Sequence, residues 1–386
     1  MKKLYFDHAA TTPLDPRVLE EMLPYLKEDY GNPSSVHSMG RRARHAVEDA
    51  RERVAAVLQA EPGEIVFTSG GTESDNAAIR GVIRATGKGL VTCAAEHEAV
   101  LRTAESLGAS GVPASILKPT PGGAVDPEDL EAALKEDVAL ASIMHANNEV
   151  GTFSAVDDVA SNCARRNVLF HCDAVQTAGI YPVSARALGA DLISISSHKM
   201  YGPKGAGALF VRAGIPFEPV QHGGAQERGR RGGTENVAAI VGFARAFELA
   251  REEAADRQAH LAALRSRLID ALASTFGNNL IFNSPRDEGQ GVAHVVSVSF
   301  PPQNGAAVDG EMLLLNLDLE GVLVSAGSAC TSGAIEPSHV LLAMGRDRAT
   351  ASATVRFSPG RSTAPEDVDR AVEILWRVHN RMRHAA

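Results

Sequence analysis

The sequence predicts an α/β protein in which a larger domain, built on a mostly parallel sheet, is joined to a smaller α+β domain. Three observations lead to this fold class. Between Glu64 and Arg212, short apolar runs alternate with helical patterns, as in a parallel sheet with crossover helices. From Glu235 to about Ala273 the chain is rich in Ala, Leu, Glu and Arg and lacks proline, which predicts a long helix leading out of the sheet. Beyond this helix, strand-like and helical segments are mixed.

The elements of the larger domain follow in chain order. Apolar residues recur at helical spacing over roughly 36–59, which predicts an amphipathic helix with Ser34 or Ser35 as its N-cap. Helices are also expected in the gaps between the strands. The six predicted strands are 64–69, 89–94, 139–146, 167–174, 191–196 and 207–212.

The smaller domain is expected to form from the two ends of the chain. We expect residues 15–255 to make the larger domain, and residues 1–14 to join residues 256–386 in the smaller one. The segments expected to build it are VAHVVSVSF (292–300), the helix-like EMLLLNLDLEG (311–321), VLVSAGS (322–328), TVRFS (354–358) and a final helix near 366–384.

Bulk composition narrows the class of protein. A chain of 386 residues, of which 44% are hydrophobic, is long enough for two or three domains of ~150 residues. Its formal net charge of −9 argues against a nucleic-acid-binding surface, which needs an excess of basic residues. No apolar run approaches the ~20 residues of a membrane span, and the start lacks the ~7 to 15 apolar residues of a secretion signal. We therefore expect a cytoplasmic protein that acts on a small molecule.

The cysteines divide into two groups. No two of them form a CxxC pair, so neither a zinc site nor a disulfide framework is indicated. Cys93 and Cys172 lie in apolar strand-like runs and Cys163 in a helical pattern, which predicts thiols of the core. Cys330 lies in GSACTSG, where small polar residues predict an exposed loop. A thiolate there could be a nucleophile; a loop cysteine without a function is the alternative.

Polar residues gather directly after five predicted strands, the place where open α/β sheets bind their ligands. If the strands are parallel, all five clusters meet at one edge of the sheet, although they span more than a hundred residues. This convergence predicts a functional site. The clusters are SGGTESDN (69–76), EHEAV (96–100), NNEVG (147–151), DAVQ (173–176) and SHKMYGPKG (197–205).

The first cluster is a glycine-containing turn between a strand and a helix. Such a turn directs free backbone N–H groups and the positive end of the helix toward an anion. A phosphate would suit Gly71 and Thr72, because Thr72 adds a hydroxyl donor. The same residues are also typical of a turn with a helix cap, and that alternative stays open. The spacing matches neither a nucleotide-triphosphate loop nor a dinucleotide fingerprint.

Asp173 and Lys199 are the candidates for cofactor chemistry. Asp173 ends a strongly apolar strand, where its charge needs a partner, and a protonated pyridine nitrogen would be one; capping of the next turn is the alternative. Strand alternation puts His171 and Asp173 on one face and Cys172 on the other, which weakens a metal site. Another apolar strand brings Lys199 to the same edge, where desolvation lowers an amine pKa and favours Schiff-base chemistry. A lone loop lysine is otherwise a solvated surface residue.

These residues belong to a series of motifs that resembles the group I cysteine desulfurases, the NifS/IscS-like branch of the class V aminotransferase family. The resemblance covers essentially the whole chain. It implies fold type I of the pyridoxal-phosphate enzymes, with a large domain on a mostly parallel seven-stranded sheet and a smaller α+β domain. The motifs are AATTP, GGTESDN, EHEAV, HANNEVG, DAVQ, SSHKMYGPKG, QERGRRGGTENV, GSACTSG and VRFSPGR.

The resemblance also implies roles for individual residues. Lys199 would hold pyridoxal phosphate as a Schiff base, and Asp173 would pair with its pyridine nitrogen. His97 would stack on the ring and serve in proton transfer. Arg356, with Asn148, would bind the substrate, the guanidinium taking its carboxylate. The other implied cofactor contacts are Gly71, Thr72, Ser196, His198 and, from the partner subunit, Thr234 at the phosphate, with Asn148 and Gln176 at the phenolic oxygen.

The implied enzyme is a homodimeric cytoplasmic sulfurtransferase that converts L-cysteine to L-alanine. Cys330 would take the sulfur as a persulfide and pass it to an acceptor protein, such as a scaffold for iron–sulfur cluster assembly, or to a thiolation pathway. No nucleic acid, membrane or metal ion is expected as a partner.

Four other functions stay open. A selenocysteine lyase or a small-molecule aminotransferase would share Lys199 and Asp173, although Cys330 argues against the aminotransferase. A non-catalytic assembly partner with this fold would not need Lys199 and Cys330. A nicotinamide dehydrogenase would need a glycine fingerprint that is missing here.

Overall fold

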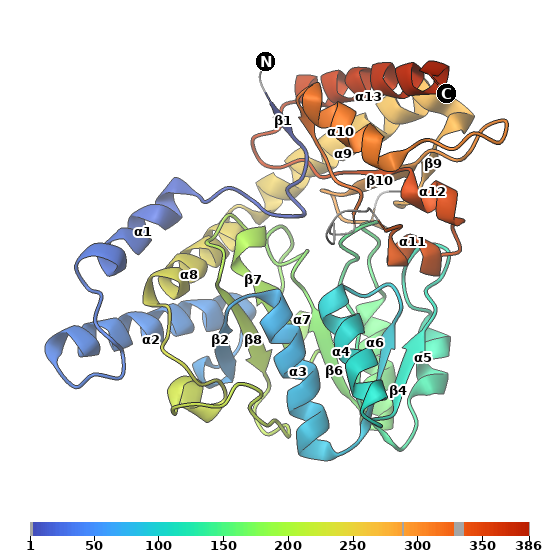
Figure 1. Ribbon diagram of the computed structural model, residues 1–386. Helices are drawn as coiled ribbons and strands as arrows, with labels where there is room; N and C mark the ends of the chain where they lie inside the picture. Colours follow the sequence, from blue (N-terminus) through green and yellow to red (C-terminus); the bar gives the residue numbers. More distant parts are fainter. Residues whose placement is uncertain (1–2, 288, 328–335, 386) are drawn as a thin grey trace.

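The computed structural model describes residues 3–287, 289–327 and 336–385 of the chain. Within these residues, a seven-stranded sheet occupies the larger part of the molecule, and the smaller part lies above it in Figure 1. The strand order is β2-β8-β7-β6-β5-β3-β4. Among these strands only β8 is antiparallel to its neighbours, β2 and β7, so the sheet is mostly parallel, as predicted.

Six of the seven strands are those that the sequence predicts. The exception is β4, a strand at the edge of the sheet whose side chains are exposed or half-buried. An edge strand with so little burial does not need the apolar run that marks its neighbours. The strands are β2 (Ile65–Thr68), β3 (Gly89–Cys93), β4 (Ala114–Leu117), β5 (Val138–Ser142), β6 (Leu169–Asp173), β7 (Leu192–Ser196) and β8 (Gly207–Val211).

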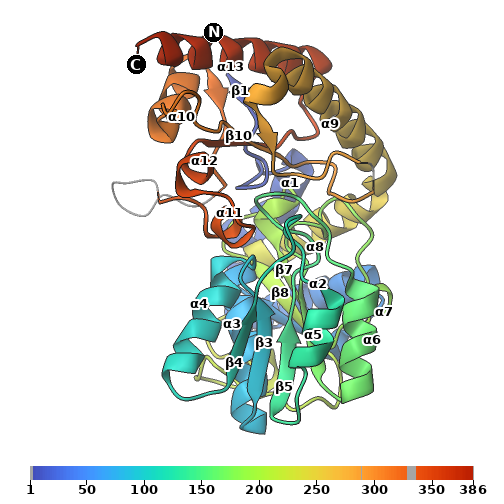
Figure 2. The ribbon, with the colours of Figure 1, turned by 90° about the vertical axis from the view of Figure 1, so that its right-hand side faces the viewer.

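Side-chain alternation along the strands creates a separate core on each face of the sheet. On one face, Val66, Leu140 and Leu209 pack with side chains of α3 and α4. On the other face, Phe67 and Ile193 pack with side chains of α2, α5, α6 and α8. Figure 2 shows helices on both sides of the sheet. The helices are α1 (Pro16–Lys27), α2 (Ser38–Leu58), α3 (Gly71–Thr86), α4 (Glu98–Ala109), α5 (Pro127–Ala133), α6 (Val156–Arg166), α7 (Ala185–Leu188) and α8 (Val237–Glu252).

Two predicted helix features are wrong. Helix α2 begins at Ser38, and its N-cap is His37, whose Nδ1 accepts a hydrogen bond from the N–H of Gly40 at 3.2 Å; neither Ser34 nor Ser35 caps it. The predicted long helix is two helices, α8 and α9, which meet at Glu253, where ψ is 6°. The chain breaks there because α8 packs in the core of the sheet and α9 in the core of the smaller part.

The smaller part has a core of its own. Leu4 and Phe6 from the start of the chain pack there with side chains of α9 and α13. In its sheets, β1 pairs in parallel with β11, and β9 and β12 flank β10 in antiparallel fashion. Strands β10 and β11 are shorter than their predicted segments. The elements are β1 (Leu4–Tyr5), α9 (Ala254–Phe276), β9 (Ile281–Phe282), β10 (Val296–Ser299), α10 (Gly310–Leu319), β11 (Val322–Leu323), α11 (His339–Ala343), α12 (Arg348–Ser352), β12 (Thr354–Phe357) and α13 (Pro365–Ala385).

A search of the described helices for a membrane span finds none that is both long and apolar enough.

Candidate active site

The loops after the parallel strands line a cavity of ≈470 Å³ between the two parts of the molecule. All five polar clusters predicted from the sequence reach it, because the carboxyl ends of β2, β3, β5, β6 and β7 point the same way. The smaller part closes the cavity from the other side. The lining residues from the five clusters are Gly71, Thr72, Asp75, His97, Glu98, Asn148, Glu149, Asp173, Val175, Gln176, His198 and Lys199.

A smaller cavity of ≈280 Å³ adjoins the first at the start of α3, and both are lined by Gly71, Thr72, Ser196 and His198. Gly70 turns the chain into the helix with φ +145°, a conformation that side-chain-bearing residues rarely adopt. The first N–H groups of a helix have no partner within it. This turn therefore offers backbone donors and a positive helix end to an anion.

The hydroxyl and imidazole groups around the turn suit the same anion. Ser196 Oγ is buried, and no described residue forms a hydrogen bond with it. His198 Nδ1 lies 3.2 Å from Thr11 Oγ1, and burial lowers the pKa of His198 to about 4. The neutral ring can still donate one hydrogen bond. A phosphate group would give Ser196 the partner that it lacks.

Lys199 ends a short 3-10 turn after β7 (Ser197–Lys199). Its Nζ donates hydrogen bonds to the carbonyl oxygens of Ala9 at 2.5 Å and Ala10 at 2.9 Å. Burial, assisted by the positive charge of Arg356, lowers the pKa of Lys199 to about 8. The amine is thus closer to its neutral, nucleophilic form than an ordinary lysine.

Asp173 ends β6 and is buried at the floor of the same cavity. Its Oδ1 accepts a hydrogen bond from the N–H of Val175 at 2.9 Å. Burial raises the pKa of Asp173, and the charges of His97 and Lys199 oppose that shift. The alternative predicted from the sequence, that Asp173 caps the turn after its strand, is thus confirmed in part. A cation placed in the cavity would still stabilise the buried carboxylate.

His97 is the N-cap of α4, and its Nδ1 accepts a hydrogen bond from the N–H of Ala99 at 3.1 Å. In the neutral ring the proton must therefore lie on Nε2. Desolvation in the cavity lowers the pKa of His97, against the attraction of Asp173. A neutral imidazole with a fixed tautomer is suited to stacking and to proton transfer.

The two amide side chains predicted for the site both line the cavity. Asn148 Oδ1 is buried, and within the part of the chain that the structure describes it has no hydrogen-bond partner. Gln176 Nε2 donates to the carbonyl oxygen of Ala9 at 3.1 Å, and its Oε1 lies 3.3 Å from His294 Nε2. Gln176 is thereby held in place, whereas Asn148 has capacity for a ligand.

Arg356 extends from β12 of the smaller part into the cavity. Its Nη2 forms an ion pair with Asp7 Oδ1 at 3.0 Å, and its Nη1 donates to the carbonyl oxygen of Asn148 at 2.9 Å. Asp7 therefore supplies the negative charge that balances the buried guanidinium of Arg356. Arg356 Nε is buried and has no hydrogen-bond partner among the described residues, so the guanidinium can still bind a carboxylate.

One predicted site residue does not line the cavity, and another falls outside the part of the chain that the structure describes. Thr234 is exposed and lies outside the lining formed by its own chain. Cys330 lies outside the described residues. The other three cysteines are buried free thiols, as predicted. Burial raises the pKa of Cys93 and of Cys163 to about 12 and that of Cys172 well above its usual value, so none of the three is a thiolate near neutral pH.

Among the lining residues that were not singled out from the sequence are Asp7, Glu149, Gly327 and His339. Glu149 lies inside a predicted cluster and Asp7 just before AATTP, so both had a signal. Gly327 and His339 come from the smaller part, where no strand-end rule locates ligand-binding residues.

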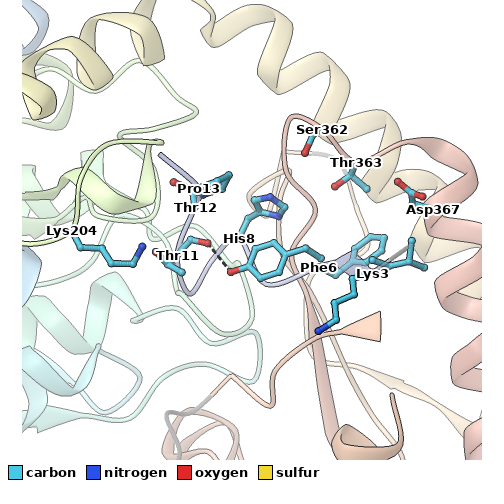
Figure 3. Close-up of a pocket in the computed structure, with 12 residues that line it drawn as sticks. Lys3, Phe6, His8, Thr11, Thr12, Pro13, Lys204, Ser362, Thr363 and Asp367 are labelled. Atoms are coloured by element: carbon cyan, nitrogen blue, oxygen red, sulfur yellow. Dashed lines mark hydrogen bonds between the residues drawn. The ribbon is translucent and has the colours of Figure 1, made fainter. Parts of the chain in front are cut away.

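A third cavity, of ≈450 Å³, lies on the other side of the N-terminal segment. Figure 3 shows His8 near its centre, between Thr11 and Thr363. The Tyr5 hydroxyl donates a hydrogen bond to the carbonyl oxygen of Thr11 at 2.9 Å. None of Lys199, Asp173 and Arg356 is among its lining residues, so the first cavity is the candidate active site.

The candidate site fits pyridoxal phosphate on the observations above. The helix turn and the unpartnered Ser196 hydroxyl suit a phosphate, and buried Asp173 suits a cationic ring nitrogen. Asn148 Oδ1 has no partner, and Lys199 is an amine with a lowered pKa. These groups line two cavities that adjoin each other.

Comparison with known proteins agrees with this fit. The model of the family described as aminotransferase class-V matches residues 4–371. A cysteine desulfurase IscS of Dictyoglomus turgidum is 44% identical over 99% of this chain and 96% of its own length. A NifS-like protein of known structure superposes with a TM-score of 0.89 at 40% identity, covering 98% of this chain and 99% of that one. A structure of SspA in complex with cysteine has a TM-score of 0.80 at 33% identity, covering 94% and 100%.

Proposed function

The chain belongs to the class V aminotransferase family, and from this premise we propose that it is a pyridoxal-phosphate-dependent cysteine desulfurase. It would convert L-cysteine to L-alanine and carry the released sulfur as a persulfide on Cys330. The observation that carries the proposal is the meeting of Lys199, Asp173 and Arg356 around one cavity. They supply an amine, a buried carboxylate and a guanidinium, which are the groups needed for a cofactor aldehyde, a pyridinium and an amino-acid carboxylate.

Each residue would act through its chemistry in the cavity. When bound, pyridoxal phosphate supplies an electron sink for electrons released at the substrate α-carbon. Lys199 would hold the cofactor, and its amine is placed to move the substrate α-proton. Asp173 would keep the ring nitrogen protonated, and His97 would stack on the ring and transfer a proton. The residues proposed to hold the phosphate and the phenolic oxygen are Gly71, Thr72, Ser196, His198, Asn148 and Gln176.

Arg356 would orient the substrate. Its side chain is fixed by Asp7 and by the carbonyl oxygen of Asn148, and a planar guanidinium can bind both oxygens of a carboxylate.

The sulfur transfer balances without an external oxidant. The Cys330 thiolate would attack the sulfur of L-cysteine, forming a sulfur–sulfur bond while the carbon–sulfur bond breaks. The electron pair of the broken bond passes to the carbon skeleton, which takes up a proton to give the methyl group of L-alanine. The sulfur is oxidised to the persulfide level and the carbon is reduced.

The working form proposed here is a cytoplasmic homodimer with Thr234 of the partner subunit at each phosphate. The exposed position of Thr234 supports this, as do the exposed apolar side chains Leu26, Tyr30 and Val36 near α1, because apolar groups on a surface favour contact with another copy. The persulfide would pass to an acceptor protein such as an iron–sulfur scaffold.

The division into domains is part of the same proposal. Residues 15–255 would bind the cofactor, and residues 1–14 with 256–386 would carry Arg356 and Cys330. The separate core formed by the N-terminal segment, α9, α10 and α13 supports this division. Helices α11 and α12 differ, because Val340, Leu341 and Ala351 pack in the core of the sheet.

The test is to follow both cofactor and sulfur. Purified protein should be yellow, and borohydride should fix the cofactor to Lys199 in wild type but not in Lys199→Ala. Treated with L-cysteine in the absence of reductant, wild type should gain one reducible sulfur on the peptide that contains Cys330 and release L-alanine.

The matched variants are Cys330→Ser and Cys163→Ser. The first should keep the yellow colour and form almost no alanine, and the second should behave as wild type because Cys163 is a buried thiol. Sulfur on a peptide other than that of Cys330, or full turnover by Cys330→Ser, would contradict the proposal.

A further inference from the structure

Glu149 is a buried carboxyl in the candidate site to which the proposed chemistry gives no part. Its exposed fraction is 3%, and it lines the cavity. Its backbone is fixed, since Asn147 Oδ1 accepts hydrogen bonds from the N–H groups of Glu149 at 2.8 Å and Val150 at 2.9 Å. Asn147 Nδ2 in turn donates to the carbonyl oxygen of Ala95 at 2.7 Å. The larger part of the molecule therefore sets the position of Glu149.

The Glu149 carboxyl contacts the chain on both sides of the residues between 327 and 336. The Ser338 hydroxyl donates a hydrogen bond to Glu149 Oε2. Gly327, with φ +99°, packs so closely that a Cβ there would lie 2.8 Å from the same oxygen. Glu149 Oε2 thus contacts both Gly327, which precedes residues 328–335, and Ser338, which follows them.

Other contacts hold the same two flanks. Arg356 Nη1 reaches the carbonyl oxygen of Gly327 at 3.5 Å. Ser338 Oγ also accepts a hydrogen bond from the N–H of Leu341 at 3.2 Å, which makes it the N-cap of α11. His339 Nε2 lies 2.9 Å from the carbonyl oxygen of Glu96. The start of α11 is therefore fastened to the strand-end loops, with Glu149 at the centre.

The pKa of Glu149 is raised by burial, and its neighbours oppose that shift only in part. The hydrogen bond from Ser338 and the charges of His339 and Arg356 lower the pKa. Glu98 is the acidic neighbour that raises it further. Burying a carboxyl costs free energy. A buried carboxyl whose Oε2 atom contacts both Gly327 and Ser338 is therefore expected to have a role at this position.

We infer that Glu149 is a positioning residue for sulfur transfer: it sets where Gly327 and Ser338, which precede and follow Cys330 in the sequence, stand beside the substrate cavity. The inference rests on the proposed desulfurase function. Its physical basis is that a nucleophile gains rate from being held near its target, and that the flanks of a short stretch limit where the stretch can reach.

The test separates chemistry at the substrate α-carbon from transfer of sulfur. Exchange of the α-proton of L-alanine with heavy water needs the cofactor and Lys199 but no thiol, whereas persulfide formation from L-cysteine needs both. Glu149→Ala should slow persulfide formation by roughly 10- to 100-fold, since ~1 Å of misplacement costs on that order. It should leave the rate of alanine exchange and the cofactor spectrum within about twofold of wild type.

Three further variants sharpen the result. Ser338→Ala should slow persulfide formation in the same way, and adding it to Glu149→Ala should cost little more, because both remove one interaction. Ser338→Thr keeps the hydroxyl and should restore most of the rate, and Glu149→Gln should fall between. Glu105→Ala, on the exposed side of α4, is the matched control and should equal wild type.

Two results would overturn the inference. Persulfide formation at the wild-type rate in both Glu149→Ala and Ser338→Ala would show that the contact has no positioning role. A parallel loss of alanine exchange would show that Glu149 supports the cofactor site instead. Should Glu149→Ala not fold, Glu149→Gln and Ser338→Ala carry the same comparison. A wild-type protein that forms no persulfide would contradict the proposed function itself.

Discussion

At the scale of single residues, Lys199 is under two opposing influences. Its hydrogen bonds to the carbonyl oxygens of Ala9 and Ala10 favour the ammonium form. Burial and the nearby charge of Arg356 favour the neutral amine, and they prevail, lowering the pKa to about 8. The N-terminal segment therefore holds Nζ in place without keeping it fully protonated. An amine poised in this way can attack an aldehyde near neutral pH.

The pH dependence of cofactor capture should report this pKa. When pyridoxal phosphate is removed and added back, its covalent capture needs an unprotonated Lys199. Because the pKa is lowered to about 8, the capture rate should rise as the pH passes 8 and level off above it. An ordinary lysine, with a pKa of ~10.4, would keep gaining rate for two further units. Stopped-flow absorbance over a pH series measures the rate, with Lys199→Ala as the blank. A rate that is still rising at pH 10 would show that burial does not control the amine.

At the scale of elements, a buried ion pair joins α2 to the loop that leads toward Thr234. Arg51 donates two hydrogen bonds to the Glu227 carboxylate, at 2.7 and 2.9 Å, and both side chains are almost fully buried. Glu227 Oε2 also accepts the N–H of Phe67 at 2.9 Å, which ties the loop to β2. Glu227 has the left-handed φ of 47°, a strained conformation for a residue with a side chain. The ion pair holds the loop in this conformation.

Removal of either partner should be costly, since it leaves a buried charge unpaired. Arg51→Ala should lower the free energy of unfolding by roughly 3–5 kcal/mol. The matched control is Arg102→Ala on α4, whose exposed pair with Glu105 should be worth less than ~1 kcal/mol. Urea unfolding of the two variants measures both values. Equal losses in the two variants would mean that the loop does not depend on the buried pair.

The elements that the sequence predicts well are those whose pattern reflects local burial. Strands such as β5 and β7 are buried along their whole length, so each appears as an apolar run. Strand β4 was missed because it lies at the sheet edge and is largely exposed. The break between α8 and α9 was missed because nothing local to Glu253 stops a helix; the division between two cores causes it.

At the scale of the whole molecule, the site combines residues that can be predicted from the sequence with residues that cannot. Asp173 and Lys199 could be predicted because strand ends of a parallel sheet converge. Asp7 and His339 reach the same cavity only because the smaller part packs over the sheet edge, and no periodicity in the chain encodes that packing. Arg356 was predicted from the resemblance, but its ion pair with Asp7 depends on the pairing of distant segments.

The dimer proposal predicts that two different variant chains can together form one intact cofactor site. Thr234 is exposed and does not line the cavities of its own chain, whereas Lys199 does. If Thr234 completes the phosphate site of the partner subunit, a hybrid of one Lys199→Ala chain with one Thr234→Ala chain has one intact site. That site combines Lys199 of the second chain with the hydroxyl of the first. The other site lacks both groups.

The hybrid, purified with a different affinity tag on each chain, should therefore bind one cofactor per dimer with wild-type affinity and show about half of the wild-type activity. The Thr234→Ala homodimer should bind its cofactor more weakly, because a phosphate oxygen loses a hydrogen bond worth about 1.5–3 kcal/mol at a charged acceptor. Titration with pyridoxal phosphate at limiting concentration distinguishes the two proteins, and the Lys199→Ala homodimer serves as the inactive control. If Thr234 acted within its own chain, the only Lys199-bearing site of the hybrid would lack it. The hybrid would then bind as weakly as the Thr234→Ala homodimer. A monomer in sedimentation that retains full activity would contradict the dimer altogether.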